Sequence, residues 1–316
     1  MRGLAVMFAI TALGPRAGTV PVSSPRLMYA TYVGTGRNSV LRGLAADFEG
    51  YSYVAATGPA VDGKGCGYLS KLNQTGTAAV WSTCLSVTEV DGLVLDSAGF
   101  IYVIGTSHPF FGNGLTFPPG APSTVIKLAP DGATILFSTQ IPGATASVIA
   151  VDSSGAVYVA GKADQTFQTT AGAYSANPLN RGFAAKLNPD GSVAYATYLG
   201  TWSVAGIAVD SMGQAWIAGT TCGDVTCSIV RYGTAAAILK LDAMGTKALV
   251  SRGFGGGQMP LIGGGFFDAA SSVAVDSSDA VWVGGSDMSL SVPTTSDGIQ
   301  PTSPQGPGST AGYAIT

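Results

Sequence analysis

A pattern of thirteen residues recurs along the chain and restricts the possible folds more than any other feature. Each copy has an apolar run that ends in Asp, a turn rich in Ser and Gly, and a second run rich in Tyr, Trp and Val. The copies span Leu93–Gly105, Ile149–Gly161, Ile207–Gly219 and Val273–Gly285, with a weaker copy at Leu44–Ala56. Their anchoring acids are Asp47, Asp96, Asp152, Asp210 and Asp276, at spacings of 49, 56, 58 and 66 residues. Such spacings indicate tandem supersecondary units.

Each copy predicts a β-hairpin, because Asp at the first turn position accepts backbone hydrogen bonds and Gly supplies a positive φ. A second hairpin follows, most clearly at Phe183–Gly200, where Pro189-Asp190-Gly191 is a strong turn signal. Related hairpins surround Lys71, Lys127 and Lys240. Each unit therefore has four antiparallel strands, here named A to D in chain order. Four-stranded units in tandem are typical of a β-propeller.

The two ends of the repeat array indicate how the ring closes. Tyr29–Gly34 matches Tyr195–Gly200, so the array begins with a strand D, whereas the last unit ends within strand C at Gly312–Ile315. We therefore expect an all-β propeller of five blades over residues 27–316, closed by the N-terminal strand D. The alternative is a fragment of a larger propeller, because Thr316 stands where other C strands carry Lys and then Leu.

Residues 1–26 precede the array as a signal-like or disordered segment. Arg2 is followed by an apolar run from Leu4 to Gly14, which has the length of a signal-peptide core and is too short to cross a bilayer. No stretch of 18 apolar residues occurs, so we expect no membrane span. A net charge of −3 makes nucleic acid a poor candidate partner, and 10% charged residues cannot supply the outer faces of a helical bundle.

The motifs resemble the bacterial β-propeller repeats called SBBP and, more distantly, NHL repeats. The resemblance rests on the Val-Asp-Ser-x-Gly hairpin, the Lys-Leu-x-Pro-Asp-Gly turn and the Tyr-Ala-Thr-Tyr-Leu-Gly strand. A further signature between strands B and C appears at Phe167–Tyr174 and Val292–Ile299, is partial at Phe117–Gly120, and is absent from the first unit. The resemblance implies a propeller on a secreted or surface-displayed bacterial protein, with no catalytic residues.

One face of this propeller is predicted to carry the variable connections. The A–B and C–D turns are short and lie on one face, so the long B–C and D–A connections lie on the other, where function is more often found. Candidate ligand-binding residues on this loop-rich face are Arg37, Arg42, Phe110, Phe111, Arg181, Trp202, Tyr232 and Phe266. Such residues also occur as ordinary loop-packing and surface residues.

A glycosidase or lyase would need paired carboxylates across a cleft. Glu89 with Asp91 or Asp268 is the pairing to test first, although most such acids are solvated or cap turns. The single histidine, His108, and the absence of an alternating ladder of acids give no metal-ligand set, and we expect no cofactor.

The four cysteines predict two disulfides. If the hairpin turn centres on Thr75, Cys66 and Cys84 face each other directly, and Cys222 and Cys227 flank a short loop. Two bridges would fit an oxidising compartment, whereas four reduced thiols would fit a cytoplasmic protein.

The function expected from the sequence is a non-catalytic, secreted or cell-surface propeller that binds a protein or carbohydrate on its loop-rich face. One alternative is a propeller glycoside hydrolase or polysaccharide lyase. Another is a structural segment of a longer surface protein, with further domains in the same chain.

Overall fold

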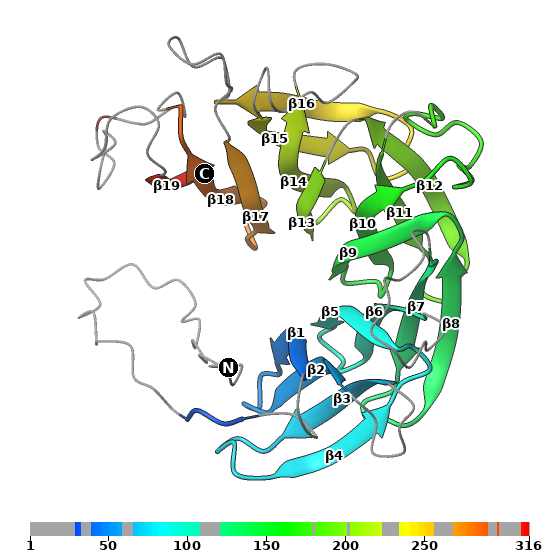
Figure 1. Ribbon diagram of the computed structural model, residues 1–316, viewed down its shortest axis with the longest axis vertical. Helices are drawn as coiled ribbons and strands as arrows, with labels where there is room; N and C mark the ends of the chain where they lie inside the picture. The colour runs from blue at the N-terminus through cyan, green and yellow to red at the C-terminus, as the bar shows by residue number, and fades with distance from the viewer. Residues whose placement is uncertain are drawn as a thin grey trace, which may run out of the picture.

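The computed structural model describes residues 29–32, 39–58, 66–107, 121–178, 181–200, 203–222, 234–255, 268–289, 296 and 311–315. These residues form five antiparallel sheets and, within the described ranges, no helix. Figure 1 shows the sheets arranged as blades around a common axis. The predicted all-β propeller with five repeats is therefore confirmed.

The strands follow the predicted hairpins closely. The first blade contains β1 (Val40–Ala46), β2 (Ser52–Gly58), β3 (Cys66–Leu72) and β4 (Ala79–Cys84). The second contains β5 (Glu89–Leu95), β6 (Ile101–Thr106), β7 (Ser123–Leu128) and β8 (Ile135–Ile141). The third contains β9 (Ala144–Val151), β10 (Val157–Ala163), β11 (Gly182–Leu187) and β12 (Val193–Gly200). The fourth contains β13 (Ser203–Val209), β14 (Ala215–Cys222), β15 (Thr234–Leu241) and β16 (Ala248–Phe254), and the fifth contains β17 (Ala269–Val275), β18 (Val281–Asp287) and β19 (Ala311–Ile315).

Within each blade the strands pair in chain order, so every blade is an antiparallel meander. The A strands β1, β5, β9, β13 and β17 lie nearest the axis, and the D strands lie at the rim (Figure 1). From β1 to β17, each A strand packs against the A strand of the blade that follows it in the chain. This topology places the A–B and C–D turns on one face, as predicted.

The hydrophobic core is divided into layers between successive blades. The B and C strands β6 and β7 are buried along their whole length, which explains their uninterrupted apolar sequences. From the first blade to the fifth, a buried cluster joins each pair of successive blades, and Phe183 and Tyr198 contribute to the cluster between the second and third blades. The low charge of the chain follows from this stacking, because both faces of most blades are covered.

The repeated Asp residues stabilise the A–B turns. Asp152 Oδ1 accepts hydrogen bonds from the backbone N–H groups of Ser154 (2.9 Å) and Ala156 (3.0 Å). Its Oδ2 accepts the Tyr158 hydroxyl hydrogen bond at 2.9 Å. Asp47, Asp96, Asp210 and Asp276 bind the same backbone positions. The prediction that these acids accept hydrogen bonds in the turns is therefore confirmed.

A lysine on strand C completes this arrangement in the first four blades. Lys186 lies opposite Tyr158, and its Nζ is 4.9 Å from the centroid of the Tyr158 ring. Lys71, Lys127 and Lys240 take the same place over Tyr53, Tyr102 and Trp216. Lys240 Nζ also lies 2.8 Å from Asp210 Oδ2. The Lys residues of the repeat thus belong to the scaffold.

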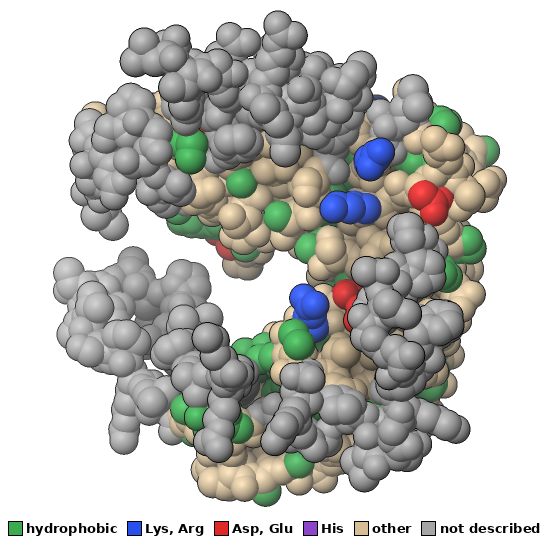
Figure 2. Space-filling model, in the orientation of Figure 1, with side chains coloured by type: hydrophobic (Ala, Val, Ile, Leu, Met, Phe, Trp, Pro, Cys, Tyr) green, Lys and Arg blue, Asp and Glu red, His purple; other side chains and the backbone are tan. Residues whose placement is uncertain are grey.

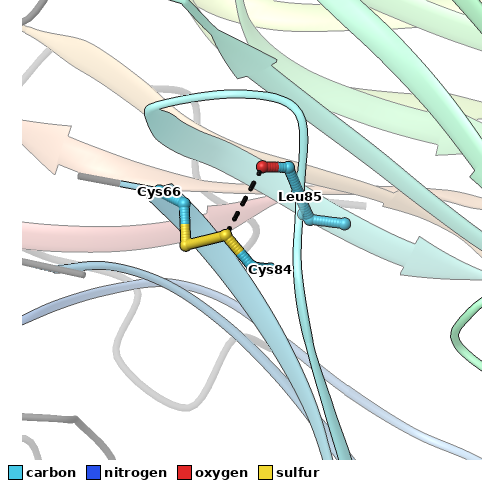
Figure 3. The surroundings of a disulfide bond; sticks show 3 residues. All are labelled: Cys66, Cys84 and Leu85. Carbon is cyan, nitrogen blue, oxygen red and sulfur yellow. Dashed lines mark hydrogen bonds between the residues drawn. A yellow bond between two sulfur atoms is a disulfide. The ribbon is translucent and has the colours of Figure 1, made fainter. Parts of the chain in front are cut away.

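The first disulfide is confirmed, but the predicted register of its hairpin is wrong. Cys66 and Cys84 are bonded, with their Cα atoms 6.0 Å apart (Figure 3). Tyr68, rather than Cys66, lies opposite Cys84. The pairing is shifted because a β-bulge follows Lys71 and the turn extends over residues 73–78. The disulfide therefore links the two strands diagonally. The second predicted disulfide, Cys222–Cys227, lies outside what the structure describes, because neither Cys227 nor the side chain of Cys222 is among the described parts.

The fifth blade has three strands among the described residues, and no described strand pairs with the outer edge of β19. Residues 29–32 are described but are not assigned to a sheet. Tyr29 packs instead on the first blade, where its hydroxyl donates a hydrogen bond to Ser52 Oγ at 2.6 Å. The expected closure by hydrogen bonds therefore stays a prediction.

Candidate functional site

Each inner strand carries a β-bulge near the loop-rich face. In β5, Val90 lies opposite Gly105 and Gly92 lies opposite Ile104, so Asp91 is the extra residue of the bulge. The corresponding extra residues in β1, β9, β13 and β17 are Arg42, Ser147, Ala205 and Ser271. Because a bulge re-aims side chains, it is a recurrent feature of sites at barrel rims and active centres.

These five bulge residues define the candidate site, a ring on the strands that line the axis. Arg42, Ser147, Ala205 and Ser271 are exposed, and Asp91 is half-buried. Among the side chains that Figure 2 draws in colour, a basic and an acidic one border the central opening over β1 and β5. The ring offers hydroxyl groups, one guanidinium and one carboxylate, which are suited to hydrogen-bonding a polar ligand.

Sequence reasoning identified Arg42 and Asp91 but missed Ser147, Ala205 and Ser271. A signal for them exists in the Gly that ends four of the five thirteen-residue copies. A Cβ atom on Gly161 would meet the Thr145 carbonyl, and one on Gly219 would meet the Ser203 carbonyl. The bulged strand A presses on strand B at this point, so the terminal Gly of the repeat marks the bulge.

Asp268 has a structural role in the fifth blade. Its side chain is fully buried, and its carboxylate accepts hydrogen bonds from the backbone N–H groups of Met288 and Ser289. Its backbone exchanges hydrogen bonds with Thr234 at 3.0 Å. The carboxylate thus links the residue that precedes β17 to the two residues that follow β18.

The other predicted residues that the structure describes are spread over several blades. Glu89 and Asp91 are half-buried on β5 in the second blade, and β5 packs between β1 and β9. Asp268 directly precedes β17 in the fifth blade, and β17 packs on β13. Arg181 is exposed immediately before β11. The structure places Arg42 and Asp91 at equivalent positions on neighbouring inner strands. It places Asp268 and Arg181 outside that ring. The remaining candidates, Arg37, Phe110, Phe111, Trp202, Tyr232 and Phe266, lie outside the described residues.

The signature at Phe167–Tyr174 belongs to the scaffold. The Phe167 ring is buried, with its centroid 5.1 Å from those of Phe183 and Tyr198. Downstream, Thr170 N–H donates to the Ala196 carbonyl at 3.0 Å, so the segment runs along the outer edge of β12. This segment therefore covers the outer edge of β12, which would otherwise be an exposed strand edge.

Within the described ranges, no three His, Cys, Asp or Glu side chains converge as a metal ion would require. The same ranges hold no helix long and apolar enough to cross a bilayer.

Comparison with known proteins gives a similarity of fold. A protein of unknown function from Bacteroides caccae is 14% identical, with a TM-score of 0.43 over 72% of each chain. The Dos1 propeller is 14% identical, with a TM-score of 0.46 over 80% of this chain and 54% of its own. A glucose dehydrogenase is 10% identical, with a TM-score of 0.44 over 83% of each chain. No family model and no curated protein matches the sequence.

Proposed function

We propose that this β-propeller is a non-catalytic binding module, which holds a protein or carbohydrate ligand at the loop-rich mouth of its central axis. The observation that carries the proposal is the ring of bulge residues. Five blades present their re-aimed side chains at the same height on the inner strands, and four of these five residues are polar. A rigid scaffold with convergent polar groups is the usual form of a small-ligand site.

We further propose that the protein acts outside the cytoplasm and that its repeats are of the SBBP type. The Cys66–Cys84 disulfide fits an oxidising compartment. The hairpins, the Asp-capped turns and the segment that covers β12 are the structural counterparts of the motifs on which the family resemblance rests.

The proposal is tested by binding to an array of neutral and acidic oligosaccharides, followed by calorimetric titration of the best sugar. We expect the Arg42→Ala and Ser147→Leu variants to bind at least about tenfold more weakly, equivalent to about 1.4 kcal/mol. Lys162→Ala is the matched control, because Lys162 is an exposed cation on β10 outside the ring. Equal loss in all three variants, or unchanged affinity in the first two, would place the ligand elsewhere.

The described residues provide no specific observation for a glycoside hydrolase or lyase. Glu89 and Asp91 share one strand, and the Asp268 carboxylate binds backbone amides.

A further inference from the structure

Tyr29 occupies the position of a strand D aromatic residue relative to the first blade. In the first three blades, the aromatic residue on strand D packs over the C–D turn glycine of the next blade. The Trp81 ring covers Gly132, the Phe137 ring covers Gly191, and the Tyr195 ring covers Gly245. Tyr29 covers Gly76 in the same way. The N-terminal segment therefore lies where the strand D of a preceding blade would lie.

The third blade shows what the sequence Tyr-Ala-Thr-Tyr does in a complete blade. After Tyr195, the backbone of Ala196 bonds to Thr170, and Thr197 Oγ1 accepts the Ser175 N–H hydrogen bond at 2.9 Å. The Tyr198 ring packs on Phe167 and is 2% exposed. All four residues thus have partners in strand C, in the next blade or in the covering segment.

Tyr29-Ala30-Thr31-Tyr32 repeats this sequence, and among the described strands only β12 shares it. Tyr32, the counterpart of Tyr198, is 76% exposed. The chain after β18 also carries a Thr-Thr pair, at Thr294 and Thr295, like Thr169 and Thr170 in the segment that covers β12.

We propose that Tyr29–Tyr32 binds the outer edge of β19 as the fourth strand of the fifth blade. The register follows from the third blade, in which Ala184 lies opposite both Ala160 and Thr197. Ala314 lies opposite Gly284, the residue that corresponds to Ala160. Thr31 therefore lies opposite Ala314, and Tyr32 lies opposite Tyr313. This inference concerns closure of the ring and is independent of the proposed ligand site.

Cross-linking tests the register directly. The double variant Thr31→Cys/Ala314→Cys is expected to form a disulfide within one molecule, seen by peptide mapping under non-reducing conditions and by an unchanged molar mass in light scattering. Ala184→Cys/Thr197→Cys is the positive control, because these residues are opposite each other in β11 and β12. Thr31→Cys/Ala311→Cys is the control for a wrong register.

Each other outcome overturns the proposal. Cross-links only between molecules would show that the strand enters a second copy. A cross-link in the positive control alone would show that Tyr29–Tyr32 does not reach β19, and equal cross-linking of the Ala311 variant would contradict the register.

A second measurement uses no cysteine. If Tyr32 is buried like Tyr198, Tyr32→Ala lowers Tm by several degrees, as Tyr198→Ala does, because removal of a packed ring is strongly destabilising. An unchanged Tm for Tyr32→Ala beside a clear fall for Tyr198→Ala would overturn the proposal.

Discussion

At the scale of the residue, one carboxylate organises each A–B turn. The Asp152 carboxylate binds two backbone amides of the turn and the hydroxyl of Tyr158 on the next strand. Burial alone would raise the pKa of Asp152. The hydrogen bonds from Ser154, Ala156 and Tyr158 outweigh this effect, so the pKa lies below its ordinary value. The same side chain therefore fixes the local turn and anchors the first strand to the second.

Asp152→Ala is expected to lower the free energy of unfolding by about 2 kcal/mol, because it leaves the turn amides and the Tyr158 hydroxyl without their charged acceptor. Chemical denaturation measures the loss. Asp190→Ala is the control, since Asp190 caps an exposed C–D turn through Ser192 alone and should cost less. An equal loss in both variants would contradict the special role of the A–B turn.

At the scale of the element, the hairpins could be predicted because their signals are local. Turn residues and apolar runs lie next to each other in the sequence, so the strands from β5 to β18 fall within the predicted repeats. The pairing of Tyr68 with Cys84 was missed, because the prediction assumed a regular hairpin, whereas a bulge follows the strand C Lys in each of the four complete blades. The bulges at Ser147 and Ser271 were also missed, and with them most of the candidate site, because the Gly that ends the repeat was not interpreted as a sign of a bulge.

The contact between successive blades predicts a difference between two glycines. Gly245 and Gly50 both have positive φ, of 67° and 89°. A Cβ on Gly245 would lie 2.5 Å from ring carbons of Tyr195, whereas one on Gly50 would meet only the Gln74 side chain at 3.7 Å. Gly50→Ala should cost about 1 kcal/mol through φ alone. Gly245→Ala should cost more, because the Tyr195 ring must also move, and equal Tm values for the two variants would contradict this.

At the scale of the whole molecule, the same set of contacts is repeated from the first blade to the fifth. Buried clusters join each blade to the next, and the strand D aromatics cover the following turns. The architecture could therefore be predicted from a single unit and its period. The ligand could not be predicted, because the repeated residues build the scaffold. Arg42, Asp91 and Ser147 occupy equivalent bulge positions but differ from blade to blade, so the repeat pattern says nothing of them.

Repetition of the capped turns also predicts how the molecule responds to acid. The pKa values of Asp131, Asp152, Asp190, Asp210 and Asp242 lie below the ordinary value of 3.8, and hydrogen bonds from Ser278, Trp282 and Ala280 lower that of Asp276 to about 2. A carboxyl group whose pKa is lower in the folded state stabilises the fold fully above its unfolded pKa. That contribution is lost as the pH falls through the folded pKa.

Tm should therefore stay nearly constant from pH 7 to about pH 5 and fall between about pH 4 and pH 2, as followed by circular dichroism. Asp276→Asn is expected to make the fall shallower, since this variant no longer gains a proton on unfolding at that site. Glu49→Gln is the control, because Glu49 lies exposed in an A–B turn without capping it. A Tm that rises toward pH 2, or an Asp276→Asn variant as acid-sensitive as the parent protein, would contradict the role assigned to the capped turns.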